Sequence, residues 1–422
     1  MTQLPKKLVI EPCEARDETN RFSASDDGKA EQSICVVDPS NGNVWGFVVV
    51  DDTRRGPGLG GIRMASDVTL GEVRRLARAM TLKNSAANLP FGGGKAGIVC
   101  DPVLMALNPG MKRDLIGLFA EAFFSVDQYI PAPDMGTNET DIQQIYEYFS
   151  ERLGTHQHMR GGASRPPDKG GIPIDEWGLT AHSLFAAIRT VEELELGFKL
   201  DGAKVVIQGY GNVGSVTASK LSDVGAVVTG ASDIHGALWH PDGLNVEQLN
   251  SIRREPGGIS NYSGKVEKQF GPDQIDWLLE TPCDILIPAA RPDAITARNA
   301  DRIQCKKIFQ GSNAPSNKMT EYYLQNRRGI ISYSDFIVNV GGVMGCAVEL
   351  KMTMDQSYRQ QVLSQGEDGK NYTDQLIYKT VSSNMRTLMS WVDDQKDGDR
   401  IFREEAQALA QERLEHPEDI WL

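Results

Sequence analysis

The feature that most constrains the fold is a glycine-rich turn that follows a short apolar strand and opens a helix. Residues 204–208 (KVVIQ) read as a buried strand, and the helical run SVTASKLSDVG begins at Ser215. Between them, residues 209–214 have the sequence GYGNVG, which is a complete GxGxxG pattern. A strand, a turn of this kind and a helix form the phosphate-binding unit of a Rossmann fold. The sequence therefore predicts a dinucleotide-binding α/β domain.

The residues of this turn have separate predicted tasks. Gly209 permits the tight turn after the strand, and Gly211 lets the backbone approach a pyrophosphate closely. Gly214 lets the helix pack close to the strand, and the first helical turn, with Asn212 and Val213, can stabilise phosphate charge. We therefore expect these five residues to bind the cofactor.

The next strand supplies an acidic residue where such folds bind the adenosine ribose. Residues 226–233 (AVVTGASD) end at Asp233, nineteen residues after Gly214. No Arg or Lys lies within residues 230–240 to neutralise a 2′-phosphate, so NAD is the predicted cofactor. NADP stays open as an alternative, because a small residue such as Ser232 can tolerate that phosphate.

More strands of the same kind surround this turn. Short apolar strands alternate with helical or loop segments at residues 204–208, 226–233, 283–290, 307–313 and 329–335. The alternation predicts a parallel, doubly wound α/β sheet. Because a chain of 422 residues is long for a single core, we expect two domains with a cleft between them.

The remaining segments divide into sheet, helix and irregular chain. Residues 34–52 read as two strands around a Pro-Ser-Asn-Gly turn. Helical spacing predicts a helix over residues 70–88, which leads into a glycine-rich loop carrying Lys95. Residues 154–175, rich in Gly, Pro and His, are predicted as a surface excursion, and residues 347–422 as C-terminal helices.

Composition and charge exclude several classes of protein. The formal net charge of −13 disfavours binding to nucleic acid or to an anionic membrane. The six cysteines lack metal-binding spacing, and His156 and His158, expected at the surface, have no third ligand, so we expect reduced thiols and no metal site. No apolar run reaches the length of a signal peptide or a membrane span, so a cytoplasmic location is predicted.

Three motifs in the N-terminal half concentrate functional residue types. They are GPGLGGIRM (56–64), MTLKN running to PFGGGKAG (80–97) and PAPDMGTNE (131–139). With the glycine turn and the later motifs PAA (288–290), GSN (311–313) and NVGGV (339–343), they resemble the glutamate/leucine/phenylalanine/valine dehydrogenase family. The resemblance covers residues 50–350 and implies an NAD(P)-dependent amino-acid dehydrogenase, which converts an L-amino acid reversibly to its 2-oxo acid and ammonia.

The residue types fit this chemistry. Oxidative deamination removes a hydride from Cα, adds water to the iminium and releases ammonia, so the site needs a carboxylate anchor and groups that move protons. A lysine acts as a general base only if burial and a neighbouring positive charge draw its pKa toward neutrality. Lys83 and Lys95, twelve residues apart, are candidates for such a pair.

The resemblance assigns a role to each candidate of the N-terminal half. Lys83 would hold the substrate α-carboxylate, Lys95 would activate the attacking water, and Asp134 would move protons to and from the amino nitrogen. Gly92 and Gly93 would lend backbone amides. Asp134 also suits a turn or a helix N-cap before the run TDIQQIYEYF, a role that catalysis does not exclude.

The resemblance extends to the cofactor side. Asn313 and Asn339 would contact the nicotinamide ribose or the substrate, and Thr180 would lie near the nicotinamide amide. The chain departs from the family around these residues, with Gln310, Ser312, Ala181 and Ser183 at positions usually taken by an acidic residue, an alanine and glycines.

Two positions bear on the side chain of the substrate. Glutamate-specific members resemble one another in a lysine before the Gly-Gly of the first motif and a serine after the Gly-Gly-Val of the last, which clamp the γ-carboxylate. This chain has Leu59 and Cys346 there. Since burying a carboxylate without a cation costs several kcal/mol, an apolar or small side chain is predicted. PAPDMGTNE is more similar to the glutamate branch, so a glutamate dehydrogenase with an altered carboxylate site stays open.

The resemblance also implies architecture and assembly. Residues 1–185 and 340–422 would form an N-terminal α/β substrate and oligomerisation domain with a mixed sheet, and residues 186–339 a Rossmann-type domain, with catalysis in the cleft between them. Family members are hexamers or other homo-oligomers, so a homo-oligomer, hexameric or smaller, is expected. Two rivals stay open: a catalytically silent NAD-binding regulatory protein, and a Rossmann dehydrogenase acting on a hydroxy acid or a tetrahydrofolate derivative.

Overall fold

The computed structural model describes residues 4–13, 30–393 and 400–418, and the chain divides into two compact units. Unit 1 comprises Met1–Pro173, Val343–Thr373 and Ala410–Leu422, and unit 2 comprises Ile174–Gly342 and Asp374–Leu409. Two α/β units were expected, but the boundaries differ from the predicted ones at residues 185 and 340.

The difference in boundaries has two parts. Helix α6 (Leu179–Glu193) belongs to unit 2, because its buried side chains pack against α7 (Asn212–Ser222) of the same unit. Most of α13 (Lys370–Asp393) and the start of α14 (Phe402–Glu415) also belong to unit 2. The sequence pattern shows that these helices are amphipathic, but it cannot show which sheet their apolar faces cover.

Unit 1 is built on a six-stranded mixed sheet with the order β1-β2-β3-β5-β4-β6. The strands are β1 (Val9–Pro12), β2 (Gln32–Val37), β3 (Val44–Asp52), β4 (Gly58–Ala65), β5 (Gly92–Val99) and β6 (Tyr129–Pro133). Strands β2 and β3 form the predicted antiparallel hairpin. Strand β4 runs parallel to β5 on one side and to β6 on the other, so the three motif-bearing segments become neighbours.

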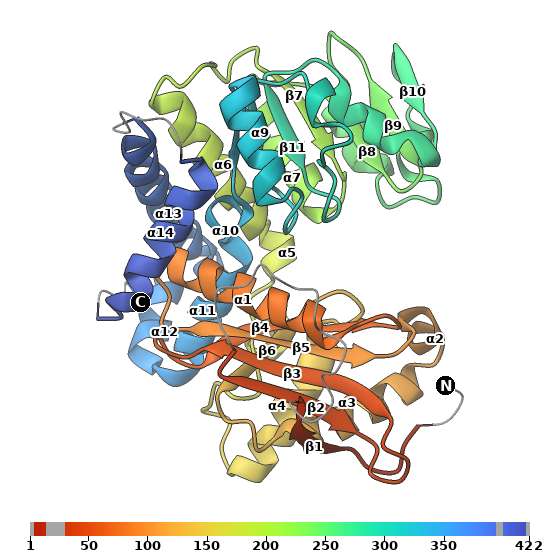
Figure 1. The fold of residues 1–422 in the computed structure, drawn as a ribbon, viewed down its shortest axis with the longest axis vertical. Coiled ribbons are helices and arrows are strands. Elements are labelled where there is room, and N and C mark those ends of the chain that lie inside the picture. The colour runs from red at the N-terminus through yellow and green to blue at the C-terminus, as the bar shows by residue number, and fades with distance from the viewer. Residues whose placement is uncertain (1–3, 14–29, 394–399, 419–422) are drawn as a thin grey trace. The chain divides into compact units, whose positions relative to one another are not determined.

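Helices cover both faces of this sheet (Figure 1). Helix α1 (Leu70–Ala86), whose N-cap is Thr69, contacts one face, and α3 (Pro109–Phe123) and α4 (Glu139–Leu153) lie on the other, after the short α2 (Pro102–Leu107). Side chains alternate along a strand. Val48 therefore packs in the core under α3 and α4, whereas its neighbour Val49 packs with Ala77 of α1.

The glycine-rich segment after α1 is a strand, so the prediction of a loop carrying Lys95 was wrong. Residues Gly92–Val99 form β5 between β3 and β4. Glycine is depleted from strands in general, but here it permits close packing. A methyl group at Gly93 would overlap Thr81 and the Ala77 carbonyl of α1. The glycines thus let α1 lie directly on the sheet.

The segment before unit 2 is only in part the predicted surface excursion, since residues 154–157 and 167–169 are exposed but its middle is not. Residues 161–165 are buried, and the Ala163 amide donates to the Pro131 carbonyl of β6. His158 is buried rather than exposed, stacks on Tyr146 at 4.5 Å between ring centroids, and lies 2.9 Å from the Ser150 hydroxyl. Burial, and then Arg165, lower the pKa of His158 to about 4.

A single buried carboxylate anchors this segment. Glu349 lies on α11 (Gly341–Met354), which begins in unit 2 and continues into unit 1, where α12 (Gln356–Leu363) follows. Its carboxylate accepts hydrogen bonds from the amides of Ser164, Arg165 and Ile172 and pairs with the Arg165 guanidinium at 3.0 Å. A buried charge is tolerated when it is paired and hydrogen-bonded in this way.

Unit 2 has a seven-stranded sheet with the order β10-β9-β8-β7-β11-β12-β13. The strands are β7 (Lys204–Gln208), β8 (Val227–Asp233), β9 (Gly236–Trp239), β10 (Lys268–Phe270), β11 (Ile285–Pro288), β12 (Lys307–Phe309) and β13 (Ile331–Tyr333). The five predicted strands are confirmed as a parallel set, while β9 and β10 add an antiparallel edge. The chain order reverses beside β7, which is where open α/β sheets bind ligands at the carboxyl ends of their strands.

The remaining helical segments are short and are distributed over both units. They are α5 (Ile174–Trp177), α8 (Val246–Ile252), α9 (Lys318–Arg328) and α10 (Asp335–Val338), with the 3-10 segments η2 (Pro167–Lys169), η3 (Gly258–Asn261), η4 (Pro272–Glu280), η5 (Ala300–Arg302) and η6 (Glu367–Gly369). Among the described residues, no helix is both long enough and apolar enough to cross a lipid bilayer.

The cysteines differ from the expectation of six reduced thiols. Cys13 and Cys35 form a disulfide that ties the end of β1 to β2, with 5.2 Å between their Cα atoms. Cys100, Cys283, Cys305 and Cys346 are free. The sequence spacing could not reveal the pair, because β1 and β2 become neighbours only through sheet formation.

Substitution of a packing glycine tests the contact between α1 and β5. We expect Gly93→Ala to lower the free energy of unfolding by about 3 kcal/mol, because the added methyl group meets backbone that cannot move aside easily. Urea denaturation measures the difference. Gly110→Ala in α3 is the matched control, since the described chain has nothing within 4 Å of the added methyl group, and it should change stability by less than about 1 kcal/mol.

Candidate active site

The predicted catalytic residues Lys95 and Asp134 form an ion pair, with 2.6 Å between Lys95 Nζ and Asp134 Oδ2. Lys95 lies on β5 and Asp134 follows the end of β6, so β4 runs between them. The side chains meet over Gly61 of β4. A methyl group there would lie 2.8 Å from Asp134 Cβ and 3.2 Å from Lys95 Nζ. The Gly-Gly of the first motif therefore makes room for the pair.

Strand alternation gathers the candidates on one face. Gly93 and Gly97 of β5 face α1, so Lys95 between them shares that face. On β4, Gly61 faces Lys95, and Leu59, two residues earlier, shares its face. Helix α1, which carries Lys83 in its last turn, covers the same face.

Arg63 is a second cation at this site, and sequence reasoning gave it no role. Its Nε lies 3.3 Å from Asp134 Oδ2, and its Nη1 lies 2.6 Å from Glu72 Oε1 of α1. Its position in GPGLGGIRM, two residues after Gly61, was the available signal, because alternate residues of a strand share a face.

The carboxyl of Asp134 is held ionised. Burial alone would raise its pKa, but Lys95 and then Arg63 outweigh burial and hold the pKa at about 2. The Thr137 hydroxyl accepts from the Asp134 amide and donates to the Ile62 carbonyl, which fixes this turn against β4. Asp134 is not the N-cap of α4, because Asn138 caps that helix.

The end of α1 is tied to the two strands beneath it. The Asn84 side-chain amide donates to the Leu59 carbonyl at 3.2 Å and to the Gly92 carbonyl at 2.6 Å. Lys83, the preceding residue, is 8% exposed, so little of its side chain reaches bulk water. The amide of Gly92 donates to the carbonyls of residues 56 and 57, so the expectation that it serves a ligand is not met.

The two positions predicted to contact the substrate side chain are both buried and apolar. Leu59 is 1% exposed, between Gly93 of β5 and Ile130 of β6. Cys346 on α11 is 6% exposed, and burial raises the pKa of its thiol well above the usual range. Neither residue offers a cation to a second carboxylate.

The glycine turn of unit 2 has the geometry that a dinucleotide requires. Gly209 has a φ of +96°, and a side chain there would meet the backbone of residues 289 and 290. Gly211 is open, since no atom of the described chain lies within 4 Å of where a side chain would start. A side chain at Gly214 would overlap the Gly209 carbonyl. The turn, the open approach and the close helix packing are all present, and α7 begins at Asn212, followed by Val213.

Asp233 lies at the end of β8, as predicted, but its carboxylate also supports the fold. Its oxygens accept from the amides of His235 at 2.8 Å and Ile259 at 2.7 Å. An arginine remote in sequence reaches the turn as well, since Arg253 Nη1 donates to Asn212 Oδ1 at 3.3 Å. This arginine follows α8 and lies outside residues 230–240, so the sequence pattern around Asp233 does not include it.

The predicted nicotinamide-side residues cluster in unit 2. The Asn339 side chain donates from Nδ2 to the carbonyls of Gly311 and Ser312 at 3.3 Å, and so holds the loop that carries the exposed Asn313. Asn339 is 5% exposed, yet its Oδ1 accepts no hydrogen bond from the described residues. A buried acceptor of this kind suits a ligand donor.

Thr180 lies at the start of α6, beside the junction of α10 and α11. A methyl group at Gly342 would lie 3.3 Å from its Oγ1. The Ser183 hydroxyl accepts from the Gly341 amide and donates to the Thr180 carbonyl. Ser183 therefore holds the first turn of α6, which contains Thr180, next to Gly341 and Gly342.

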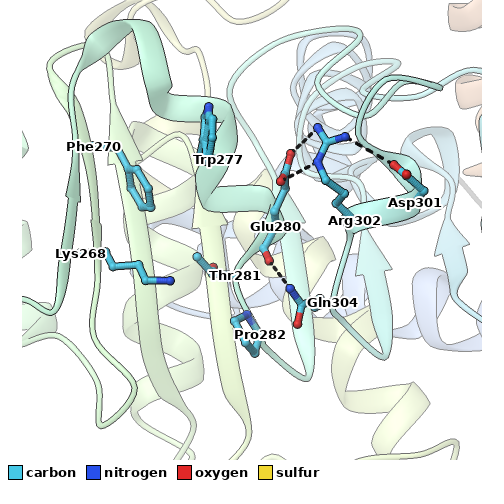
Figure 2. Close-up of a pocket in the computed structure, with 9 residues that line it drawn as sticks. All are labelled: Lys268, Phe270, Trp277, Glu280, Thr281, Pro282, Asp301, Arg302 and Gln304. Carbon is cyan, nitrogen blue, oxygen red and sulfur yellow. Dashed lines mark hydrogen bonds and ion pairs between the residues drawn. The ribbon is translucent and has the colours of Figure 1, made fainter.

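A cavity of about 490 Å³ in unit 2 contains none of these residues (Figure 2). It is lined by Lys268, Phe270, Trp277, Glu280, Thr281, Pro282, Asp301, Arg302 and Gln304. Pro282 precedes β11 and Gln304 precedes β12, so the cavity lies at the amino ends of these strands, opposite the glycine turn. Arg302 inside it pairs with Glu280 through two hydrogen bonds.

Comparisons with known proteins match both units. Residues 170–416 match the family model of Glutamate/Leucine/Phenylalanine/Valine dehydrogenase, and residues 31–151 match that of the Glu/Leu/Phe/Val dehydrogenase dimerisation domain. The chain is similar to a glutamate dehydrogenase of Aeropyrum pernix, with 35% identity over 300 residues, which are 70% of this chain and 68% of the relative.

Other relatives differ in cofactor. An NADP-specific glutamate dehydrogenase of Saccharolobus shibatae is 34% identical over 301 residues, covering 70% of this chain and 68% of its own. A catabolic NAD-specific glutamate dehydrogenase of Bacillus subtilis is 35% identical over 291 residues, which are 68% of this chain and 66% of the relative. A solved hetero-hexameric glutamate dehydrogenase of Thermus thermophilus, with leucine bound, shares the fold at a TM-score of 0.73 and 24% identity over 98% of this chain and 89% of its own.

The ion pair predicts a pH-dependent stability. A carboxyl whose pKa falls from 3.8 to about 2 on folding contributes about 2 kcal/mol above pH 4, and this contribution is lost as the pH falls from about 4 toward 2. We expect Asp134→Asn to be less stable than the wild type at pH 7 by at least that amount, and the gap to narrow below pH 4. Urea denaturation between pH 7 and pH 3 measures it. A gap that stays constant with pH would contradict this account.

Proposed function

Because the chain belongs to the Glu/Leu/Phe/Val dehydrogenase family, it is an NAD(P)-dependent oxidoreductase of CH-NH2 donors, and we propose that its substrate is an L-amino acid with an apolar or small side chain. The products would be the 2-oxo acid and ammonia, in a reversible reaction. The observation that carries the proposal is the Lys95–Asp134 pair on the same face of the sheet as the buried Leu59.

The ion pair suits the proton transfers of deamination. A nicotinamide, when bound, accepts the hydride that leaves the substrate Cα. Lys95 would activate the water that attacks the imine carbon, and the contact of 2.6 Å gives a direct path for a proton between Lys95 and Asp134. Arg63 would keep the Asp134 carboxyl group oriented toward Lys95 and would favour return of the proton. Lys83, buried at the end of α1, would bind the α-carboxylate.

The preference for an apolar side chain rests on electrostatics. A γ-carboxylate placed against Leu59 and Cys346 would lose its hydration without gaining a cation, which costs several kcal/mol. The alternative is a glutamate dehydrogenase with an altered carboxylate site. The named relatives at about 35% identity, which are glutamate dehydrogenases, favour this alternative.

We propose NAD as the cofactor, held by the glycine turn and by Asp233. The carboxylate of Asp233 still has lone pairs for ribose hydroxyls besides its two amide bonds. Asn313, Asn339 and Thr180 would bind on the nicotinamide side, where Asn339 Oδ1 is available to a donor. NADP is the second candidate, because Arg253 lies beside Asn212 and relatives of both specificities exist.

We propose a homo-oligomer of up to six chains. Residues 31–151 match a dimerisation domain, and the structural neighbour from Thermus thermophilus is described as hetero-hexameric. A cytoplasmic location stays a prediction from the sequence.

A substrate panel tests the proposed reaction. Purified protein should form NADH fastest with leucine, valine, phenylalanine or a small L-amino acid, as followed by absorbance. A clear maximum with glutamate would establish the altered-site alternative instead. No turnover with any amino acid would favour a catalytically silent NAD-binding protein. Turnover with hydroxy acids would favour a Rossmann dehydrogenase that acts on a hydroxy acid.

A companion variant, Leu59→Lys, should raise kcat/KM for glutamate relative to leucine by about tenfold or more, since a buried carboxylate then gains a cation. Leu59→Met is the matched control, because it preserves an apolar side chain of similar volume. If the ratio of kcat/KM for glutamate to that for leucine is the same in both variants, Leu59 does not line the side-chain pocket.

Cofactor choice is testable at Asp233. We expect Asp233→Ser to raise the ratio of kcat/KM for NADP to that for NAD by about tenfold, because the carboxylate repels a 2′-phosphate and binds ribose hydroxyls. The exposed Asp223 at the end of α7 serves as the control, with Asp223→Ser leaving the ratio unchanged. If Arg253→Met abolishes use of NADP and the wild type prefers that cofactor, the NAD proposal is overturned.

A further inference from the structure

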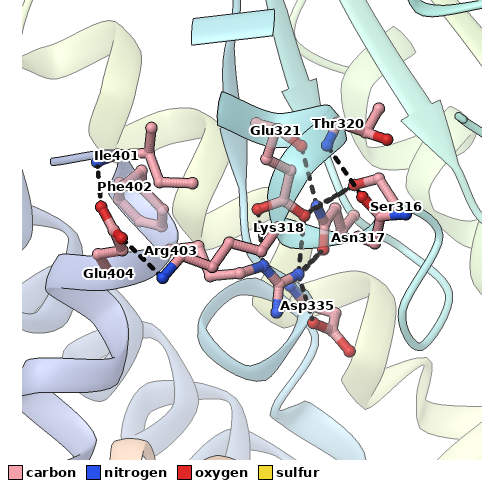
Figure 3. A network of polar contacts seen from close by, with 12 residues as sticks. Ser316, Asn317, Lys318, Thr320, Glu321, Asp335, Ile401, Phe402, Arg403 and Glu404 are labelled. Carbon is pink, nitrogen blue, oxygen red and sulfur yellow. Dashed lines mark hydrogen bonds and ion pairs between the residues drawn. The ribbon is translucent and has the colours of Figure 1, made fainter. Parts of the chain in front are cut away.

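A buried polar network contacts the loop that carries Asn313. Figure 3 shows part of it, around Glu321, Asp335 and Arg403. The network joins five segments of unit 2: the end of β12, the start of α9, β13, the start of α10 and, from far along the chain, the start of α14. Its members are Gln310, Ser316, Glu321, Ser332, Asp335 and Arg403. The predicted cofactor role of the loop does not explain this network.

Gln310 is the hub of the network and is fully buried. Its Nε2 donates to Glu321 Oε1 at 2.6 Å and lies within 3.0 Å of the Ser316 and Ser332 hydroxyls. Its Oε1 accepts from the Asp335 amide at 3.0 Å and from Arg403 Nη2 at 3.3 Å. Both ends of the side-chain amide are therefore used.

Asp335 connects the hub to the loop. Its Oδ2 accepts the Ala314 amide at 3.0 Å, directly after Asn313. Ala314 has a φ of +47°, a left-handed conformation that a residue with a side chain adopts only when its surroundings hold it. On the other side of Asn313, the amides of Gly311 and Ser312 donate to the Pro288 carbonyl. The loop is thus anchored on both flanks, and Asp335 forms the second anchor.

Arg403 supplies the positive charge that this arrangement needs. It reaches in from α14 and forms two hydrogen bonds with the Glu321 carboxylate, at 2.7 and 2.8 Å. Its Nη2 lies 3.7 Å from Asp335 Oδ1. Glu321 and Asp335 are 2% and 6% exposed, so without this guanidinium two carboxylates would remain in a poorly solvated interior.

We propose that Arg403 is a positioning residue for the cofactor, which acts through Asp335 and Gln310 to hold loop 311–314 in its binding conformation. This inference rests on the proposed function, because it takes Asn313 as a nicotinamide-side contact. Helix α14 thereby influences the cofactor site of unit 2 through Arg403 and the loop.

The same network explains why Gln310 departs from the acidic residue usual in the family. Its Nε2 lies 2.6 Å from Glu321 Oε1, so a carboxylate at position 310 would meet a second carboxylate. Two such groups ionise together only with difficulty, and one retains a proton at higher pH. An amide donates without this restriction.

The decisive experiment compares Arg403→Met, Arg403→Lys and Arg302→Met in the full chain. Arg302→Met is the matched control, because Arg302 also forms a double hydrogen bond with a glutamate of unit 2, but in the cavity remote from the loop (Figure 2). Hydrogen exchange measured by mass spectrometry reports on the peptide covering residues 311–316. Fluorescence titration with NADH and NADPH reports the Kd without any amino-acid substrate.

For Arg403→Met we expect faster exchange of residues 311–316 and a rise in the Kd for the reduced cofactor on the order of fivefold or more. Arg403→Lys should recover part of both effects, and Arg302→Met should show neither. The KM for the amino acid should change less than the KM for the cofactor, whereas a general loss of folded protein would lower kcat alone.

Each of the other possible results would contradict a different step of the proposal. Unchanged exchange in Arg403→Met would show that Arg403 does not hold the loop, whatever the protein's reaction. Faster exchange with unchanged cofactor affinity would show that the loop does not position the cofactor. Failure of the wild type to bind NADH or NADPH would overturn the proposed function, and with it this role of the loop.

Gln310→Glu adds an independent test through pH. At low pH one carboxyl of the new pair is protonated and can donate in place of the amide, and as the pH rises both ionise and repel. We expect its cofactor Kd to rise with pH relative to the wild type between pH 6 and pH 9. A ratio that stays constant over this range would contradict the contact with Glu321.

Discussion

The absence of a side chain at Gly61 allows the charged centre of unit 1 to exist. Lys95 lies on β5 and Asp134 directly follows β6, the two strands that flank β4. Their side chains meet over Gly61 of β4, where a side chain would collide with both residues. Their proximity then determines the electrostatics, since Lys95 and Arg63 keep the Asp134 carboxyl ionised in a buried setting. Gly93 of the neighbouring strand β5 also has to lack a side chain, because α1, which carries Lys83, packs directly against it.

Unit 2 uses glycine and remote charges in a comparable way. Its turn at residues 209–214 leaves open backbone where a pyrophosphate is expected, and a buried network is hydrogen-bonded to loop 311–314 through Asp335. The cation of that network, Arg403, comes from the C-terminal helix. A short loop cannot hold its own conformation against chain entropy, so its geometry depends on the residues that anchor it.

The choice of amino acid depends on a small part of the protein. Family membership establishes the reaction class, and the named relatives act as glutamate dehydrogenases. Yet Leu59 and Cys346 are buried without a cation, and desolvation of a second carboxylate there is unfavourable. Substrate choice within a common fold is a matter of such local contacts.

What the sequence determined by itself was the reaction class, the glycine turn and the strands of the parallel sheet, because those patterns are local and their spacing reflects repeating geometry. It misread β5 as a loop, since glycine in a strand signals close packing only when the partner is known. It also misplaced His158, α6 and two cysteines, whose surroundings come from distant segments. Only the tertiary structure brought Arg63, Arg253 and Arg403 to their sites, because charge acts through space and sequence separation does not measure that distance.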